Sequence, residues 1–131
     1  MNNMPQILLV DDDAALLQAL PQALSLRVNN LQVDTCDSAV EALEQIPVHD
    51  YDAIVSDIKM PGMDGLALCE QIRNLPQHKL TPIVFVTSLT DFKTWARAIL
   101  SGGNDVITKP ILPVELCVKV ITLLLKNHSV Q

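Results

Sequence analysis

Positive charge is scarce in this sequence, and that scarcity argues against a nucleic-acid-binding surface. Only 9 of the 131 residues are Lys or Arg, against 15 Asp or Glu, so the formal net charge is −6. A protein that binds nucleic acid needs basic side chains to neutralise many phosphates. We therefore expect no direct nucleic acid binding by this chain.

Paired cysteines and long hydrophobic runs are also missing. Cys36, Cys69 and Cys117 are scattered and form no CxxC pair, which argues against a disulfide framework or a zinc site. We expect all three to be small buried residues. No apolar run approaches the roughly 20 residues that span a bilayer, and the opening MNNMPQ lacks the profile of a signal peptide. The expectation is a soluble, cytoplasmic protein without membrane contact.

Short, fully apolar runs alternate with longer amphipathic stretches along the chain, which is typical of βα units around a parallel sheet. No linker or repeat interrupts the pattern, so we expect one domain over residues 1–131. The predicted strands are Gln6–Val10, Leu31–Thr35, Ala53–Ser56, Pro82–Thr87 and Asp105–Thr108. The predicted helices are Asp13–Arg27, Ser38–Ile46, Gly65–Leu75, Asp91–Leu100 and Pro113–Lys126.

Polar side chains gather where the predicted strands end, at the edge where an open parallel sheet places its crevice. In chain order these residues are Asp11, Asp12 and Asp13, then Asp57, then Thr87 and Ser88, and finally Lys109 before Pro110. Crowded carboxylates repel one another unless a cation lies among them. The oxygen ligands suit Mg²⁺, which is typically held by one or two carboxylates plus phosphate oxygens.

A carboxylate beside Mg²⁺, with a lysine and a hydroxyl nearby, is equipped to accept a phosphoryl group. Aspartate nucleophiles form acyl phosphates in a known class of covalent catalysis. In this interpretation Asp57 is the nucleophile, Lys109 stabilises charge on the transferring oxygens, and Thr87 hydrogen-bonds one of them.

Four motifs make the chain resemble a receiver domain of the response regulators of bacterial two-component phosphorelay signalling. In order along nearly the whole chain they are ILLVDDD, IVSDIKMPGMDG, PIVFVTS and ITKP. The expected fold class is accordingly α/β, a doubly wound five-stranded parallel sheet of the flavodoxin-like (βα)₅ type with strand order 2-1-3-4-5.

The resemblance also implies a set of ligands for Mg²⁺. Asp12 would bind the ion directly, Asp11 would bind it largely through water, and the backbone carbonyl of Lys59 would complete the set beside Asp57. Asp13 is instead expected to be an N-terminal helix residue favoured by the helix dipole.

The resemblance further implies that a sensor histidine kinase or phosphotransfer protein phosphorylates Asp57. Thr87 would report the phosphoryl group to the fourth strand and helix, and Lys109 would pair with it ahead of a cis peptide at Pro110. Such a domain is a phosphorylation-dependent switch, and an enzyme only in catalysing its own phosphorylation and dephosphorylation. These motifs encode neither the kinase, nor the stimulus, nor the output.

The chain departs from the family pattern in two respects. The residue three before Lys109 is usually aromatic in receivers and moves its ring as the domain switches, but it is Val106 in this chain. The acidic pair common just before that position is replaced by Asn104 and Asp105. Phosphorylation is still expected, whereas the route by which the signal reaches the fourth helix and fifth strand is left open.

Two alternatives compete with the switch. A Mg²⁺-dependent phosphohydrolase of the haloacid dehalogenase type would use Asp11 and Asp13 as its DxD motif, but it needs a late acidic pair and would leave Asp57 idle. Beyond Lys109 the chain has only Glu115. The other alternative is a pseudo-receiver that docks partners without phosphorylation, against which the complete acidic, hydroxyl and lysine set argues.

The fourth and fifth predicted helices carry more apolar residues than one buried stripe requires. A helix lying on one face of a sheet needs about three or four apolar positions in two turns, and PVELCVKVITLLLK exceeds that. This surplus predicts self-association or partner docking through helices four and five. Covering of the surplus by neighbouring side chains or by a downstream domain is the alternative.

Overall fold

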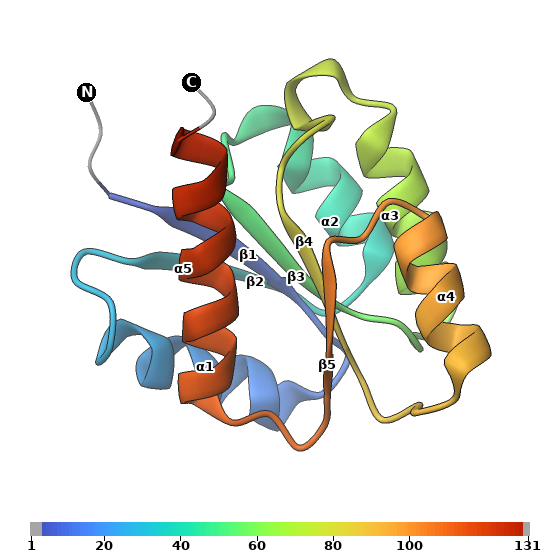
Figure 1. Ribbon diagram of the computed structural model, residues 1–131, viewed down its shortest axis with the longest axis horizontal. Helices are drawn as coiled ribbons and strands as arrows, with labels where there is room; N and C mark the ends of the chain where they lie inside the picture. The colour runs from blue at the N-terminus through green and yellow to red at the C-terminus, as the bar shows by residue number, and fades with distance from the viewer. Residues whose placement is uncertain (1–3, 130–131) are drawn as a thin grey trace.

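The computed structural model describes residues 4–129, and these form one parallel sheet with helices on both faces (Figure 1). The strands are β1 Gln6–Val10, β2 Gln32–Cys36, β3 Ala53–Asp57, β4 Ile83–Thr87 and β5 Asp105–Thr108. The helices are α1 Ala14–Ser25, α2 Ala39–Gln45, α3 Gly65–Arg73, α4 Phe92–Leu100 and α5 Pro113–Ser129. The five strands lie in the order β2-β1-β3-β4-β5, which confirms the predicted topology.

Predicted and observed bounds agree most closely for the strands, because continuous apolar runs mark them. β1 and β5 have the predicted bounds, whereas α1 ends at Ser25 instead of Arg27. Two short 3₁₀ turns were not predicted, η1 at Ile46–Val48 and η2 at Pro76–His78. Both begin at or beside a proline, which ends the preceding regular structure because it has no backbone N–H.

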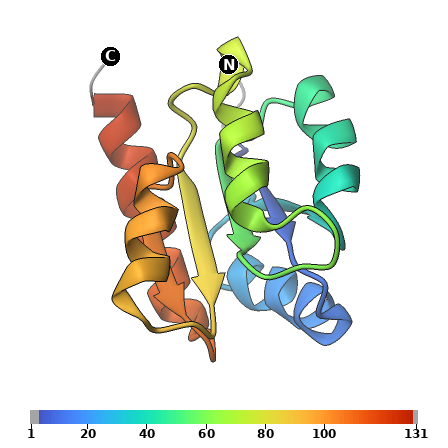
Figure 2. The ribbon, with the colours of Figure 1, turned by 90° about the vertical axis from the view of Figure 1, so that its right-hand side faces the viewer.

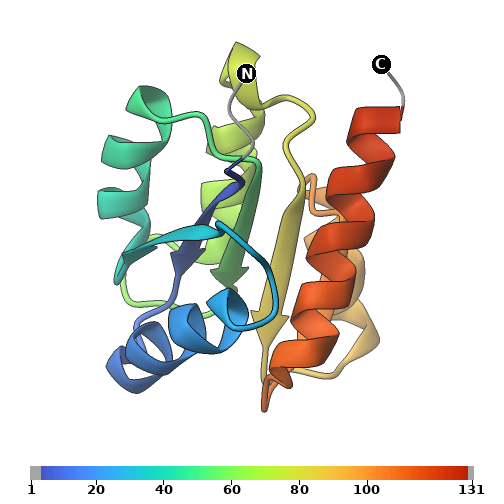
Figure 3. The same ribbon diagram turned by 90° about the vertical axis from the view of Figure 1, so that its left-hand side faces the viewer.

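Figures 2 and 3 show helices on both faces of the sheet, and side-chain alternation along the strands divides the apolar interior between these faces into two layers. Successive strand side chains point to opposite faces of a sheet, so one buried strand contributes to both layers. The layer under α2, α3 and α4 includes Leu8, Val10, Ile54, Ile83 and Phe85. The layer under α1 and α5 includes Ile7, Leu9, Val55, Val84 and Val86. Cys36, Cys69 and Cys117 are free and buried, as predicted.

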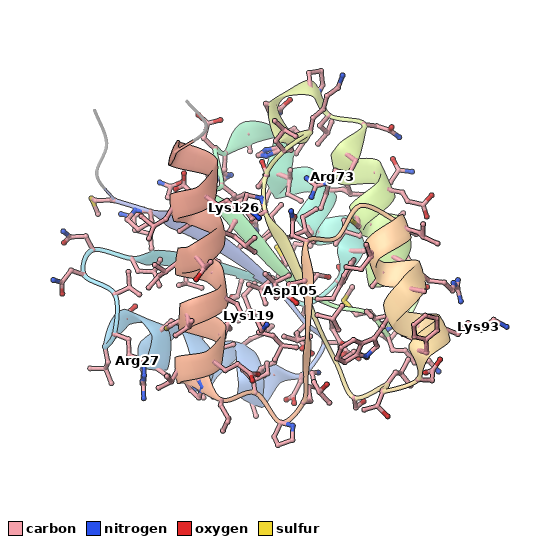
Figure 4. All side chains as sticks on the ribbon, in the orientation of Figure 1. Arg27, Arg73, Lys93, Asp105, Lys119 and Lys126 are labelled. Carbon is pink, nitrogen blue, oxygen red and sulfur yellow. The ribbon has the colours of Figure 1, made fainter. Side chains whose placement is uncertain are left out.

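An ion pair joins the last helix to the edge strand. Lys119 of α5 places its Nζ 3.0 Å from Asp105 Oδ2 of β5 (Figure 4).

Within residues 4–129, no helix combines the length and the apolar character that crossing a membrane requires.

Arg73 clamps the sheet edge opposite the carboxyl ends of the strands (Figure 4). Its Nη1 donates to the carbonyls of His78 and Thr81 at 2.9 and 2.6 Å, so it fixes the loop before β4. Its Nη2 donates to Gly102 O at 2.7 Å and to Asn104 Oδ1 at 2.9 Å, so it also fixes the loop before β5. Gly102 has φ +112°, and an added Cβ would lie 2.8 Å from Arg73 Cγ. A glycine is therefore required where the clamp closes.

We predict that Arg73→Met lowers the free energy of unfolding by about 2–4 kcal/mol, because several half-buried carbonyls lose a charged donor together. Urea denaturation at neutral pH measures the loss. Arg27→Met is the matched control, since Arg27 is exposed just beyond the end of α1 and donates to the carbonyl of Ala23 in that helix. The control should change stability by less than about 0.5 kcal/mol. Equal effects of the two substitutions would contradict the clamp.

Candidate functional site

The carboxyl ends of three strands bring Asp11, Asp57 and Lys109 together. Asp11 follows β1 directly, Asp57 ends β3, and Lys109 follows β5. β1 lies beside β3, and β4 separates β3 from β5. The backbone N–H of Lys109 donates to the carbonyl of Thr87 at 2.8 Å, which holds the start of the β5–α5 loop against the end of β4.

Lys109 lies between the two buried carboxylates. Its Nζ is 3.2 Å from Asp57 Oδ2 and 3.0 Å from Asp11 Oδ2. Burial alone would lower the pKa of Lys109, but its contacts with Asp11 and Asp57 outweigh burial and raise that pKa above its ordinary value. The ammonium group therefore stays charged. It extends from the loop after β5, past the end of β4, to both carboxylates.

The pKa of Asp57 is raised above its ordinary value of 3.8. Burial of the carboxyl group is the main cause and the negative charge of Asp11 adds to it, while Lys109 pulls the pKa down without cancelling them. Asp57 is only 6% exposed and Asp11 is fully buried. Two buried acids thus share one lysine, and one negative charge is left uncompensated.

The acidic cluster has the donor set of a divalent cation site. One carboxylate oxygen from each of Asp11, Asp12 and Asp57 lies within 4.8 Å of the others. Asp11 Oδ1 accepts the backbone N–H of Asp13 at 2.9 Å. Asp11 Oδ2 is in ion-pair contact with Lys109 but has no well-directed hydrogen bond from any described residue. A buried oxygen with spare acceptor capacity beside two further carboxylates suits a hard cation such as Mg²⁺.

Asp13 is the N-cap of α1 and not part of this cluster. Its Oδ1 accepts the backbone N–H groups of Ala15 and Leu16 at 3.0 and 3.3 Å. The predicted helix-terminal role of Asp13 is therefore confirmed, since an N-cap carboxylate satisfies backbone donors that the helix leaves unpaired.

The loop after Asp57 is closed by a glycine. Gly65 begins α3, and its N–H donates to Ile58 O at 2.8 Å. A Cβ added at Gly65 would clash with the backbone carbonyl of Asp57, so no larger residue fits there. Lys59 lies in this loop with an exposed side chain. The close approach of α3 to β3 therefore fixes the backbone on which Lys59 sits.

Thr87 ends β4 and is 1% exposed. Its Oγ1 accepts the backbone N–H of Leu89 at 3.0 Å. The Leu89 carbonyl in turn accepts the indole Nε1–H of Trp95 at 3.1 Å. This contact could not be predicted from the sequence, because the spacing between Leu89 and Trp95 gives no signal for a hydrogen bond from the indole to the loop backbone.

The three residues that differ from the family pattern each have specific partners in the structure. Val106 is buried and pairs in register with Phe85. Asn104 Oδ1 accepts the N–H of Ile83 at 2.8 Å in addition to Arg73, while Asp105 pairs with Lys119. The peptide bond between Lys109 and Pro110 is cis, as expected.

Comparisons with known proteins agree on one family. Residues 7–121 match the response regulator receiver domain family. The chain is 35% identical over 126 residues to the transcriptional regulatory protein KdpE of Staphylococcus aureus, covering 95% of this chain and 52% of that protein. It is 34% identical over 105 residues to the signal transduction histidine-protein kinase BarA of Shigella flexneri, covering 80% of this chain and 11% of the kinase. The chain thus spans about half, or much less, of these relatives.

Solved structures give the same result. A response regulator receiver domain protein from Methanospirillum hungatei superimposes with a TM-score of 0.90 at 26% identity, covering 98% of this chain and 100% of that one. A two-component response regulator from Clostridium difficile superimposes with a TM-score of 0.85 at 30% identity, covering 92% of this chain and 96% of that one.

We predict that Asp57→Asn raises the melting temperature at neutral pH in the absence of divalent cations. Because the folded-state pKa of Asp57 is raised, folded protein holds a proton that unfolded chain releases, and stability falls as pH rises from near 3.8 through the raised pKa. The substitution removes this loss, so its advantage should grow through that window and then level off. The expected gain is on the order of 1 kcal/mol, or about 3–5 °C.

Thermal melts in EDTA across the pH range measure this difference. Asp50→Asn is the matched control, because Asp50 is exposed in the loop before β3 at the opposite edge of the sheet. The control should melt with the unmodified chain at every pH. A lower melting temperature for Asp57→Asn at neutral pH would show that the Lys109 ion pair outweighs burial and repulsion.

Proposed function

We propose, from the premise that this chain belongs to the family of response regulator receiver domains, that Asp57 is the phosphoacceptor of a signalling switch. Phosphorylation-dependent signalling in two-component systems is the function of the family to which it belongs. The observation that supports Asp57 is the position of its carboxylate, which lies 3.2 Å from Lys109 Nζ and shares an acidic cluster with Asp11 and Asp12.

Mg²⁺ is the cation that the acidic cluster fits. Asp11, Asp12 and Asp57 would hold it together with the backbone carbonyl of Lys59, and the spare acceptor capacity of Asp11 Oδ2 supports this assignment. When bound, Mg²⁺ supplies charge neutralisation for the phosphoryl oxygens. Its positive charge would also oppose burial and the charge of Asp11, which together raise the pKa of Asp57.

The chain's own residues have separate roles in the transfer. An Asp57 carboxylate oxygen forms the new bond to phosphorus while the bond from phosphorus to the donor's imidazole nitrogen breaks. The Lys109 ammonium group, held near by Asp11, is positioned to stabilise charge on the phosphoryl oxygens. Thr87, buried at the end of β4, supplies a hydroxyl that can donate to one of them.

The donor is a sensor histidine kinase or a phosphotransfer protein, and the receiver domain extends over residues 1–131. We place the protein in the cytoplasm, where such donors act, and assign it no reaction other than its own phosphorylation and dephosphorylation. The phosphohydrolase alternative is disfavoured by Asp13, whose carboxylate caps α1 and is not grouped with the carboxylates of Asp11, Asp12 and Asp57. The pseudo-receiver alternative is disfavoured because Lys109 contacts both acids of the cluster.

We predict that acetyl phosphate with Mg²⁺ adds one phosphoryl group to this chain, and that Asp57→Asn abolishes the addition. Intact-mass spectrometry measures the product, and EDTA should prevent its formation. Asp50→Asn is the matched control and should be labelled like the unmodified chain. Equal labelling of Asp57→Asn would reject the assignment. Continuous hydrolysis of an aryl phosphate, dependent on Asp11 and Asp13, would instead favour the phosphohydrolase.

A second element of the proposal is a homodimer through α4 and α5, which lie on either side of the edge strand β5 (Figure 1). Both helices leave large apolar side chains exposed. On α4 these are Phe92, Trp95, Ile99 and Leu100, and on α5 they are Val114, Val118, Ile121 and Leu125. Exposed apolar surface commonly marks an interaction site where it is contiguous, and the proposal is that these two rows of side chains form one such surface with β5 between them.

We predict that the protein dimerises when the phosphoryl mimic beryllofluoride is bound with Mg²⁺. Light scattering over a concentration series should show the mass of a dimer, and Leu100→Glu should restore the monomer because it places a charge in the apolar contact. Leu26→Glu is the matched control, since Leu26 is equally exposed beyond the end of α1. A monomer at about 100 μM would exclude binding in the micromolar range, where the free energy is roughly −8 kcal/mol.

A further inference from the structure

Trp95 links α4 to the loop that leaves the candidate site. It is the sole tryptophan of the sequence and lies in the first half of α4. Its indole Nε1–H donates to the carbonyl of Leu89 at 3.1 Å, across the start of the helix. The N–H of the same Leu89 donates to Thr87 Oγ1 at 3.0 Å. Leu89 is therefore held at its N–H by a side chain of the site and at its carbonyl by a side chain of α4.

The other end of this chain of contacts reaches Asp57. The Thr87 carbonyl accepts the N–H of Lys109 at 2.8 Å, and Lys109 Nζ lies 3.2 Å from Asp57 Oδ2. Thr87 itself is buried, so its hydroxyl has few positions open to it. A change of charge at Asp57 can therefore affect α4 through Lys109, Thr87 and Leu89, each of which contacts the next in space.

No ring on β5 competes with this route. Val106 occupies the β5 position that pairs with Phe85, and it is a small, buried aliphatic residue. A valine has no long lever that could swing between the interior and the surface, whereas Trp95 is 38% exposed and combines a large ring with a hydrogen-bond donor. Of the two, Trp95 is the side chain whose position can report the state of the loop.

We propose that Trp95 is the positioning residue that couples Thr87 to α4, holding the β4–α4 loop while Asp57 is unmodified and releasing it when Thr87 turns toward a phosphoryl oxygen. The proposal rests on the function proposed for Asp57. A turn of Thr87 to another staggered rotamer moves Oγ1 away from the N–H of Leu89. The Leu89 peptide then loses its anchor at the site, its carbonyl shifts, and the indole hydrogen bond breaks.

This coupling must be reciprocal. If the phosphorylated state lacks the bond between Trp95 and Leu89, removing the bond in advance makes that state easier to reach by the same factor. The loss of one ordinary, partly exposed hydrogen bond corresponds to a factor of about 2–10. Trp95→Phe, which keeps an aromatic ring and removes the donor, should therefore tighten beryllofluoride binding by about that factor.

Two measurements on the full chain test the proposal, both with Mg²⁺ present and beryllofluoride as the probe. In the first, the emission of Trp95 is followed during titration at a protein concentration where light scattering shows only monomer, so that contacts between copies do not change it, and its maximum should shift as the indole leaves Leu89. The shift should be absent in Asp57→Asn. In the second, calorimetric titration compares dissociation constants for the unmodified chain, Trp95→Phe and a control. Lys93→Ala is the control because Lys93 points away from the body of the protein on the same helix (Figure 4) and should bind like the unmodified chain.

The outcomes separate this proposal from the function on which it rests. Calorimetric binding without a shift in emission, or with an unchanged or weaker constant for Trp95→Phe, would overturn the coupling and leave the phosphoacceptor role intact. Failure of the unmodified chain to bind beryllofluoride and to accept a phosphoryl group at Asp57 would overturn both. An emission shift together with tighter binding by Trp95→Phe alone would establish Trp95 as the link.

Discussion

The site depends on the position of one ammonium group between two buried carboxylates. Without Lys109, the buried carboxylates of Asp11 and Asp57 would face each other without a nearby positive charge, and burial already raises the pKa of Asp57. With it, the cluster holds together but keeps a surplus of negative charge and an acceptor oxygen on Asp11 without a hydrogen-bond donor among the described residues. That incomplete compensation suits a cation site, because a cluster whose negative charge was already neutralised would attract a further cation only weakly. The uncompensated negative charge at the carboxyl ends of the strands costs electrostatic free energy, and the same charge would attract a cation.

Burial of apolar side chains elsewhere in the fold offsets this electrostatic cost. Three of the five strands, β1, β3 and β4, are almost completely buried, and apolar layers cover both faces of the sheet. Such close packing restrains the backbone at the strand ends, so the Cα positions of Asp57 and Thr87 are held in place while their side chains face the site. At the opposite edge, Arg73 uses its guanidinium group to satisfy carbonyls of two loops at once. The two ends of the sheet therefore differ in electrostatic character: one is saturated with hydrogen bonds, and the other is left short of positive charge.

The sequence was sufficient to predict the strand order and the residues that meet at the site. The strand order came with the resemblance that the four motifs carry, whereas the meeting of Asp11, Asp57 and Lys109 follows from regular patterns: apolar runs mark buried strands, and parallel strands bring their carboxyl ends to the same end of the sheet. Contacts made by irregular backbone could not be predicted in this way. The guanidinium of Arg73 donates to Gly102, 29 residues away in the chain. His78, the last residue of η2, is buried with its Nδ1 2.8 Å from Thr81 Oγ1. Such contacts depend on loop conformations and side-chain rotamers, which have no periodic signature. The exchange of an acidic pair for Asn104 and Asp105 was visible in the sequence, but their partners Arg73 and Lys119 were not.

The contacts of α4 at its two ends are of unequal strength, and this inequality determines where the helix can move. Its C-terminal end is held by Gly103, whose N–H donates to Ala98 O at 3.1 Å, and by Arg73, which grips the adjoining Gly102. At its N-terminal end, the contacts in the described part of the chain are the Asp91 cap and the bond from Trp95 to Leu89, both at the surface. A segment opens first where its hydrogen bonds are few and exposed to solvent. A disturbance at Thr87 therefore meets the looser end of α4, while the clamp keeps the other end in place. If the bond from Trp95 to Leu89 breaks as proposed, the larger displacement of α4 is therefore expected at its N-terminal end, while Arg73 and Gly103 hold the C-terminal end.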